Sequence, residues 1–122
     1  MGIIFLTLKV SNPAKPRRFA VVKFLIDSGA AYSVVPEETL RKIGICPTSK
    51  RSFILANGEL IERKTGDAIF EYRGISGASP VIFGQKDDSV LLGVVTLEAL
   101  GFALDPIKRE LKALPLTLAS FR

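Results

Sequence analysis

The 122-residue sequence has no histidine, no tryptophan and a single cysteine, Cys46. Without histidine the chain cannot form a Ser-His-Asp or Cys-His catalytic group, and it lacks the imidazole ligands of most zinc sites. One cysteine cannot close an intrachain disulfide, which argues against a disulfide-stapled secreted scaffold. Because no histidine can activate its thiol, we interpret Cys46 as a small buried residue rather than a nucleophile. Carboxylates, hydroxyls, amines and the backbone remain as the groups that can carry chemistry.

Long hydrophobic runs are also absent. No stretch approaches the roughly 20 apolar residues that a bilayer-spanning helix needs, because Lys or Asp interrupts every run. The apolar start, Met1–Val10, is short and has neither a basic leader nor a small-residue cleavage pattern, so no signal peptide is predicted. We therefore expect a soluble, cytoplasmic protein with no membrane partner.

What the sequence does contain is the composition of a folded domain. Apolar residues make up 48% of the chain and charged residues 24%, which excludes a disordered protein. The length suits one domain, residues 1–122, with one hydrophobic core. The 17 basic and 12 acidic residues leave a formal charge of +5, but the basic ones occur as dispersed pairs, such as Lys50-Arg51 and Arg63-Lys64. Nucleic-acid binding would need them on one stripe with stacking aromatics, so we predict no nucleic-acid partner and keep a nucleic-acid-binding barrel as the last of three hypotheses.

Short apolar segments bounded by Gly, Pro, Ser or Asp recur along the chain and predict an all-β barrel or sandwich. The first two, Ile3–Val10 and Phe19–Ile26, are expected to pair. A projecting hairpin is predicted next, because Asn57-Gly58 best tolerates the positive φ angles of a type I′ turn and is flanked by Arg51–Ala56 and Glu59–Lys64. The remaining predicted strands are Asp67–Arg73, Pro80–Phe83, Val90–Leu92, Phe102–Leu104 and Glu110–Leu114.

Two short helices are predicted among these strands. Pro36–Ile43 begins with a proline and two glutamates, ends on basic residues and is followed by Gly44. Val95–Leu100 is followed by Gly101 in the same way. The two segments are weakly similar to each other, which indicates either a duplicated strand-turn-helix unit or a chance match.

Asp27 is the residue whose position most suggests chemistry. It directly follows the apolar strand Phe19–Ile26 and precedes Ser28, Gly29 and Ala30. A carboxylate at the end of a buried strand is costly unless hydrogen bonds stabilise the anion. Gly29 lets the backbone approach that carboxylate, and Ser28 offers a hydroxyl. The tripeptide alone is compatible with a reactive carboxylate or with an ordinary Asx turn, which most Asp-Ser-Gly tripeptides form.

The order of motifs along the chain resembles the retroviral-type (retropepsin-like) aspartic proteases of clan AA. From about Phe19 to about Leu114, the turn Asp27–Ala30 is followed by a short helix, the Asn57-Gly58 hairpin, and Leu91–Gly93 with a second helix. The segment that begins at Leu91 looks most like the small bacterial single-domain members. The resemblance implies an all-β, closed retropepsin-like barrel with one or two short helices and a flap hairpin.

The same resemblance implies roles for individual residues. Asp27 matches the catalytic aspartate. Ser28, Gly29 and Ala30 match the rest of the family's active-site turn. Ser28 matches the hydroxyl residue that ties the two active-site turns of the family together. The substrate-binding flap tip matches Ala56, Asn57 and Gly58, and the supporting strand matches Leu91, Leu92 and Gly93. No metal and no cofactor is implied.

Aspartic peptide hydrolysis needs two carboxylates on one water, and the chain has one Asp-Ser-Gly. The adjacent acids Asp87-Asp88 lie in a polar loop and are interpreted as a solvated turn. We therefore predict a homodimeric aspartic endopeptidase with Asp27 of each subunit at the twofold axis and an extended peptide under the flap. Leu116–Phe121 is expected to be either a strand of the dimer sheet or a tail. The alternative hypothesis is a catalytically silent dimer of the same fold that binds peptide or mediates protein interaction.

Overall fold

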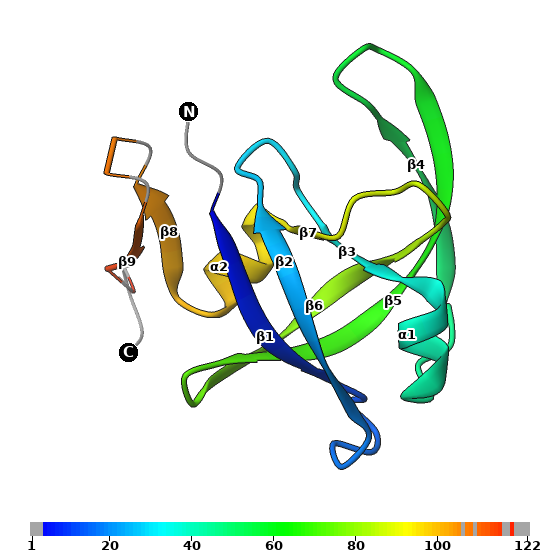
Figure 1. The fold of residues 1–122 in the computed structure, drawn as a ribbon, viewed down its shortest axis with the longest axis horizontal. Helices are drawn as coiled ribbons and strands as arrows, with labels where there is room; N and C mark the ends of the chain where they lie inside the picture. The colour runs from blue at the N-terminus through cyan, green and yellow to red at the C-terminus, as the bar shows by residue number, and fades with distance from the viewer. Residues whose placement is uncertain (1–3, 106, 109, 116–117, 119–122) are drawn as a thin grey trace.

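The structure, a computed structural model, describes residues 4–105, 107–108, 110–115 and 118. Within these residues the chain forms mainly β-strands, with two short helices (Figure 1). The elements follow one another in the order β1 (Phe5–Ser11), β2 (Phe19–Ile26), β3 (Ser33–Pro36), α1 (Glu37–Lys42), β4 (Ser49–Ile54), β5 (Leu60–Tyr72), β6 (Ile75–Gly84), β7 (Leu91–Leu92), α2 (Val94–Ala99), β8 (Phe102–Asp105) and β9 (Glu110–Ala113).

A seven-stranded sheet curls into a ring. Its strand order is β1-β2-β7-β3-β6-β5-β4, and β1 also pairs with β5. Lys9 of β1 lies opposite Val21 of β2 on one side and Glu71 of β5 on the other, so the ring closes at the C-terminal half of β1. Figure 1 shows β4 and the first half of β5 leaving this ring as a projecting hairpin, with the two-stranded sheet β8-β9 at the opposite end. The predicted all-β barrel with two short helices is confirmed.

The inside of the ring holds the hydrophobic core. Phe24, Phe70 and Phe83 are fully buried, and the ring centres of Phe24 and Phe70 lie 5.9 Å apart in a tilted arrangement. Such aromatic pairs add packing energy beyond the area that they bury. Leu40 of α1 and Leu97 of α2 belong to the same cluster, so both helices are anchored on the barrel.

Most predicted strands are confirmed, and Phe19–Ile26 matches β2 residue for residue. The predicted strands Glu59–Lys64 and Asp67–Arg73 are wrong as separate elements, because they are parts of the continuous strand β5. Gly66 between them does not mark a turn. A Cβ added there would lie 3.1 Å from Cε1 of Phe83, so this glycine makes room for a buried ring.

Both predicted helices are present, and each ends two residues before its predicted glycine. α1 begins after Pro36, and α2 begins one residue earlier than expected, after Gly93. Gly44 and Gly101 follow them with φ angles of 83° and 81°, a conformation that glycine adopts without steric cost.

The tip of the β4-β5 hairpin is not the predicted type I′ turn at Asn57-Gly58. That turn needs positive φ at both central residues, and in this loop the positive φ is that of Gly58, 86°. The N–H of Gly58 donates to the carbonyl of Leu55 at 2.9 Å, and the N–H of Leu55 donates to the carbonyl of Glu59 at 2.8 Å. The loop is therefore longer and closed by a left-handed glycine. Two consecutive positive φ angles, 49° and 81°, occur instead at Arg73-Gly74, which joins β5 to β6.

Two further predictions concern the surface and the end of the chain. Cys46 is exposed, so its interpretation as a buried residue is wrong. The preceding residue, Ile45, takes the buried position after α1 and leaves the thiol facing solvent.

The predicted segment Leu116–Phe121 lies, apart from Leu118, outside the described residues. Neither α1 nor α2, the helices of the described part of the chain, is long and apolar enough to cross a bilayer.

Candidate active site

Asp27 lies where β2 ends, in the loop that leads to β3 (Figure 1). Its N–H donates to the carbonyl of Leu92 in the parallel strand β7 at 3.2 Å. Its half-buried side chain accepts a hydrogen bond at Oδ1 from the N–H of Gly29 at 2.8 Å. A Cβ added to Gly29 would lie 3.2 Å from the same oxygen, closer than most such contacts. The bond is that of an Asx turn, and it fixes the orientation of the carboxylate.

A second segment, β7 and the start of α2, packs directly against this loop. The N–H groups of Val94 and Val95 donate to the carbonyls of Ala30 and Ala31 at 2.9 and 3.0 Å. A Cβ on Gly93 would lie 2.5 Å from the carbonyl carbon of Tyr32, so no side chain fits at that position. The structure thus brings the predicted active-site turn and the predicted supporting strand together.

Three buried hydroxyls connect these two segments, and sequence analysis missed them. Ser33 Oγ accepts the N–H of Gly93 at 2.9 Å and lies 2.5 Å from Thr96 Oγ1. Thr96 Oγ1 also lies 2.9 Å from Ser79 Oγ of β6. Each of the three residues is almost fully buried, and Ser79 Oγ also donates to the carbonyl of Pro80 at 3.1 Å, so the hydroxyls satisfy one another together with nearby backbone groups. In the sequence, each of these residues is a hydroxyl residue within a mainly apolar segment. That pattern indicates a buried hydroxyl but does not identify its hydrogen-bond partner.

A groove of about 670 Å³ lies between the Asp27 loop, the β4-β5 hairpin and the loop after β6. Its lining is mainly apolar and includes Tyr32, Val34, Phe53, Ile61, Ile82 and Leu91. Gly29 and Ala30 of the predicted active-site turn also line it. Ser28 instead borders a second hollow of about 210 Å³, between α2 and β8. The turn therefore borders a groove with the volume of a ligand-binding cleft on one side and a smaller, mainly apolar hollow on the other.

The predicted flap tip Ala56–Gly58 lies at the end of the projecting hairpin. Asn57 Oδ1 accepts the N–H of Glu59 at 2.9 Å and so orders the tip. The groove is lined by the preceding residues, Ile54 and Leu55, rather than by the tip itself. Ile54 is 75% exposed, which leaves an apolar side chain beside the groove open to contact.

Asp88 is not the solvated turn residue that the sequence suggested. Its carboxylate forms a two-pronged ion pair with Arg63 of β5, with Oδ2 2.7 Å from Nε and Oδ1 2.9 Å from Nη2. The N–H of Gln85 donates to the same carboxylate at 2.7 Å. The hydrogen bond from Arg63 is the main cause that holds the pKa of Asp88 below its usual value, while burial opposes it. The pair attaches the loop after β6 to the base of the hairpin, whereas Asp87 is exposed, as predicted.

No group of three or more His, Cys, Asp or Glu side chains in the described part of the chain is placed to hold a metal ion. The polar side chains that line the groove are two carboxylates, one guanidinium, one phenol and two serine hydroxyls, those of Asp87, Asp88, Arg63, Tyr32, Ser52 and Ser89.

Comparison with solved structures relates this arrangement to a known fold. The solution structure of a simian foamy virus protease is similar, with a TM-score of 0.51 and 19% identity over 76% of this chain and 92% of that one. The chain has the retropepsin-like fold. A retropepsin-like aspartic protease from Rickettsia conorii aligns over 86% of this chain and 94% of its own, with 25% identity and a TM-score of 0.42. No protein-family model and no curated protein matches the sequence.

Within the retropepsin-like fold, the residues that the sequence singled out fall into two groups. Asp27–Ala30 and Leu91–Gly93 meet at the centre of the site through backbone hydrogen bonds. Ala56–Gly58 stand apart from them, at the tip of the hairpin. The functional roles assigned to these residues stay predictions.

Proposed function

We propose that the chain is an aspartic endopeptidase that acts as a homodimer, with Asp27 as its catalytic residue. The observation that carries the proposal is the placement of Asp27. Its carboxylate is held by the N–H of Gly29, in a loop whose next residues line a groove of about 670 Å³ beneath a projecting hairpin. The likeness in fold to a solved structure that is itself a protease adds support.

The chemistry explains why two chains are needed. Two carboxylates held about 3 Å apart cannot both ionise, so they share one proton. The ionised carboxylate takes a proton from the water as that water attacks the scissile carbonyl, and the protonated one stabilises the developing oxyanion. The chain has one Asp-Ser-Gly motif, and the carboxylate of Asp88 is paired with Arg63, so the proposal takes the second carboxylate from Asp27 of a partner subunit.

The proposed substrate is a peptide in extended conformation. A β-strand can pair through its backbone with the walls of a groove and place alternate side chains in pockets. The apolar lining, which includes Val34, Ile61 and Leu91, favours apolar side chains near the scissile bond.

The decisive experiment replaces the carboxylate while it keeps the shape of the side chain. Asp27→Asn should abolish cleavage of an apolar peptide library at mildly acidic pH and leave the melting temperature nearly unchanged. Asp67→Asn is the matched control, because Asp67 is an exposed carboxylate of β5 that does not line the groove. Full activity of Asp27→Asn would remove Asp27 from the mechanism.

Mixing the two proteins tests the shared site. When equal amounts of wild type and Asp27→Asn exchange subunits freely, about a quarter of the dimers contain two Asp27 residues. Activity should therefore fall with the square of the wild-type fraction. Activity that falls in direct proportion would instead indicate that one chain is sufficient. Peptide binding without cleavage by wild type would support the silent peptide-binding dimer.

A further inference from the structure

The hairpin beside the groove pairs like charges across its two strands. Arg51 of β4 lies opposite Arg63 of β5, and Lys50 lies opposite Lys64. Like charges directly opposite each other destabilise a strand pair. Because side chains alternate between the two faces of a strand, the lysine pair and the arginine pair project to opposite sides of the hairpin.

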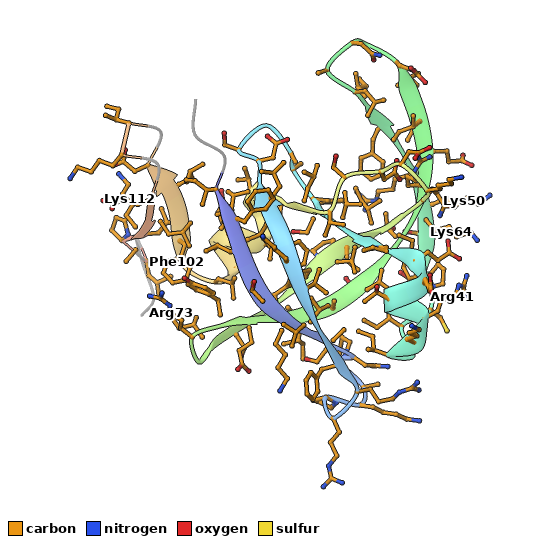
Figure 2. The ribbon with its side chains drawn as sticks, viewed as in Figure 1. Arg41, Lys50, Lys64, Arg73, Phe102 and Lys112 are labelled. Carbon is orange, nitrogen blue, oxygen red and sulfur yellow. The ribbon has the colours of Figure 1, made fainter. Side chains whose placement is uncertain are left out.

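The two faces differ in how this charge is compensated. Figure 2 shows Lys50 and Lys64 on the outer side of the hairpin, and Lys50 Nζ lies 3.6 Å from Oε1 of Glu62. On the other face, Arg63 is neutralised by Asp88. Arg51 forms no ion pair with any carboxylate of the described residues. The groove side of the hairpin therefore carries one guanidinium whose charge is uncompensated.

Arg51 is not itself a lining residue of the groove, but it is held beside the groove by one that is, Tyr32. Its Nη1 donates to the hydroxyl of Tyr32 at 3.0 Å, and its guanidinium carbon lies 5.7 Å from the centre of the Tyr32 ring. Phe53 packs edge-on against the same ring at 6.0 Å between ring centres. Tyr32 and Phe53 both line the groove. A guanidinium has five N–H donors, and within the described residues the hydrogen bond of the Arg51 side chain is the one to Tyr32, which leaves donors for a ligand.

We propose that Arg51 binds a carboxylate of the peptide that occupies this groove, so that preferred substrates carry an acidic group beside an otherwise apolar segment. This inference rests on the proposed function, because the peptide is the substrate of that site. Arginine suits the role because its planar group can bind a carboxylate through two parallel hydrogen bonds. The acidic group is accepted at one position only, next to Arg51, because Asp87 also lines the groove and repels a carboxylate near it.

The test compares matched peptides in which Glu or Gln is scanned through every position around the cleaved bond. Wild type should cleave the Glu peptide about fivefold more efficiently, measured as kcat/KM, at one position, which is the effect expected of an exposed ion pair. Arg51→Gln should remove this preference, so that the ratio of kcat/KM for the Glu peptide to that for the Gln peptide falls to about one. Arg51→Lys should keep part of it, because the charge remains but the two-pronged geometry is lost. A second pair of peptides ends at the position where Glu is preferred and carries either a free or an amidated C-terminus. This pair distinguishes binding of a side-chain carboxylate from binding of a terminal carboxylate.

Arg73→Gln is the matched control. Arg73 lies over a tyrosine ring as Arg51 does, 5.1 Å from the centre of Tyr72, but at the β5-β6 turn far from the hairpin tip (Figure 2). It should retain the full preference for Glu.

Two results would overturn the inference. Equal kcat/KM for Glu and Gln peptides at every position, and for free and amidated C-termini, would overturn it and leave the peptidase proposal intact. If wild type cleaves nothing, the peptidase proposal fails. The role of Arg51 is then tested by binding alone, measured as the fluorescence anisotropy of labelled acidic and neutral peptides. Equal or absent binding of the acidic and neutral peptides then overturns the inference, whereas tighter binding of the acidic peptide that Arg51→Gln abolishes supports it.

Discussion

Replacement of Gly93 by alanine should disturb the centre of the site more than its overall fold. Gly93 has φ −92° and ψ 171°, which alanine adopts freely, so any effect is steric. The added methyl would lie 2.5 Å from the carbonyl carbon of Tyr32 and 2.6 Å from its oxygen. Both are backbone atoms that cannot rotate away, so an ordinary contact of 3.4 Å requires a displacement of about 0.9 Å.

The magnitude follows from that overlap. Overpacking in a closely packed region costs about 1–3 kcal/mol, and we expect Gly93→Ala to lie at the upper end because the neighbour is backbone. With a slope of about 1–3 kcal/mol per M, urea denaturation should show a midpoint about 1–3 M lower and an unchanged slope. The displaced backbone is the loop that carries Asp27. Peptide cleavage should therefore fall strongly even at temperatures where Gly93→Ala remains folded.

Gly101→Ala is the control for glycine replacement itself. Gly101 has a φ of 81° and nothing within 4 Å of an added Cβ, so its cost is conformational, about 1 kcal/mol. Cleavage by Gly101→Ala should be normal. If Gly93→Ala were as stable and as active as wild type, the close packing of β7 against the Asp27 loop would not be what positions the site.

The remaining predictions concern the ion pair and the buried hydroxyls. Asp88→Asn should lower the free energy of unfolding by about 1 kcal/mol at neutral pH. Because Arg63 lowers the pKa of Asp88 from the usual 3.8, this stabilisation is present above about pH 4 and lost as the pH falls through the lowered pKa, so thermal melts of wild type and variant should converge in acid. A constant difference down to about pH 2 would contradict that assignment. Thr96→Val should lower the free energy of unfolding by about 1–2 kcal/mol, because it leaves the hydroxyls of Ser33 and Ser79 without their shared partner. If urea denaturation showed a variant as stable as wild type, the hydroxyl network would not be needed for stability.

Local sequence signals were sufficient for most strands and for both helix ends. The apolar run Phe19–Ile26, bounded by turn residues, matches β2, and Gly44 and Gly101 end the helices as their positions predicted. These features depend on residues within a few positions of one another. The same local information misled at Gly66, where a glycine that makes room for Phe83 looked like a break between strands. Glycine is favoured both where the chain packs closely and where it turns. Only the residues that surround the glycine in the folded structure distinguish these two causes.

The sequence by itself determined that the chain is a β-rich domain with a carboxylate, Asp27, at the end of an apolar strand, although only Phe24 and Ile26 of that strand are buried. Its motif order also indicated the retropepsin-like fold that the structure has. Only the tertiary structure showed that Arg63 pairs with Asp88 while Arg51 has no ion pair among the described residues, and that Ser33, Thr96 and Ser79 share hydrogen bonds. These contacts join residues that are 17 to 63 positions apart in the chain. Strand register and barrel closure decide which side chains meet, and neither is encoded in the spacing of residues along one segment.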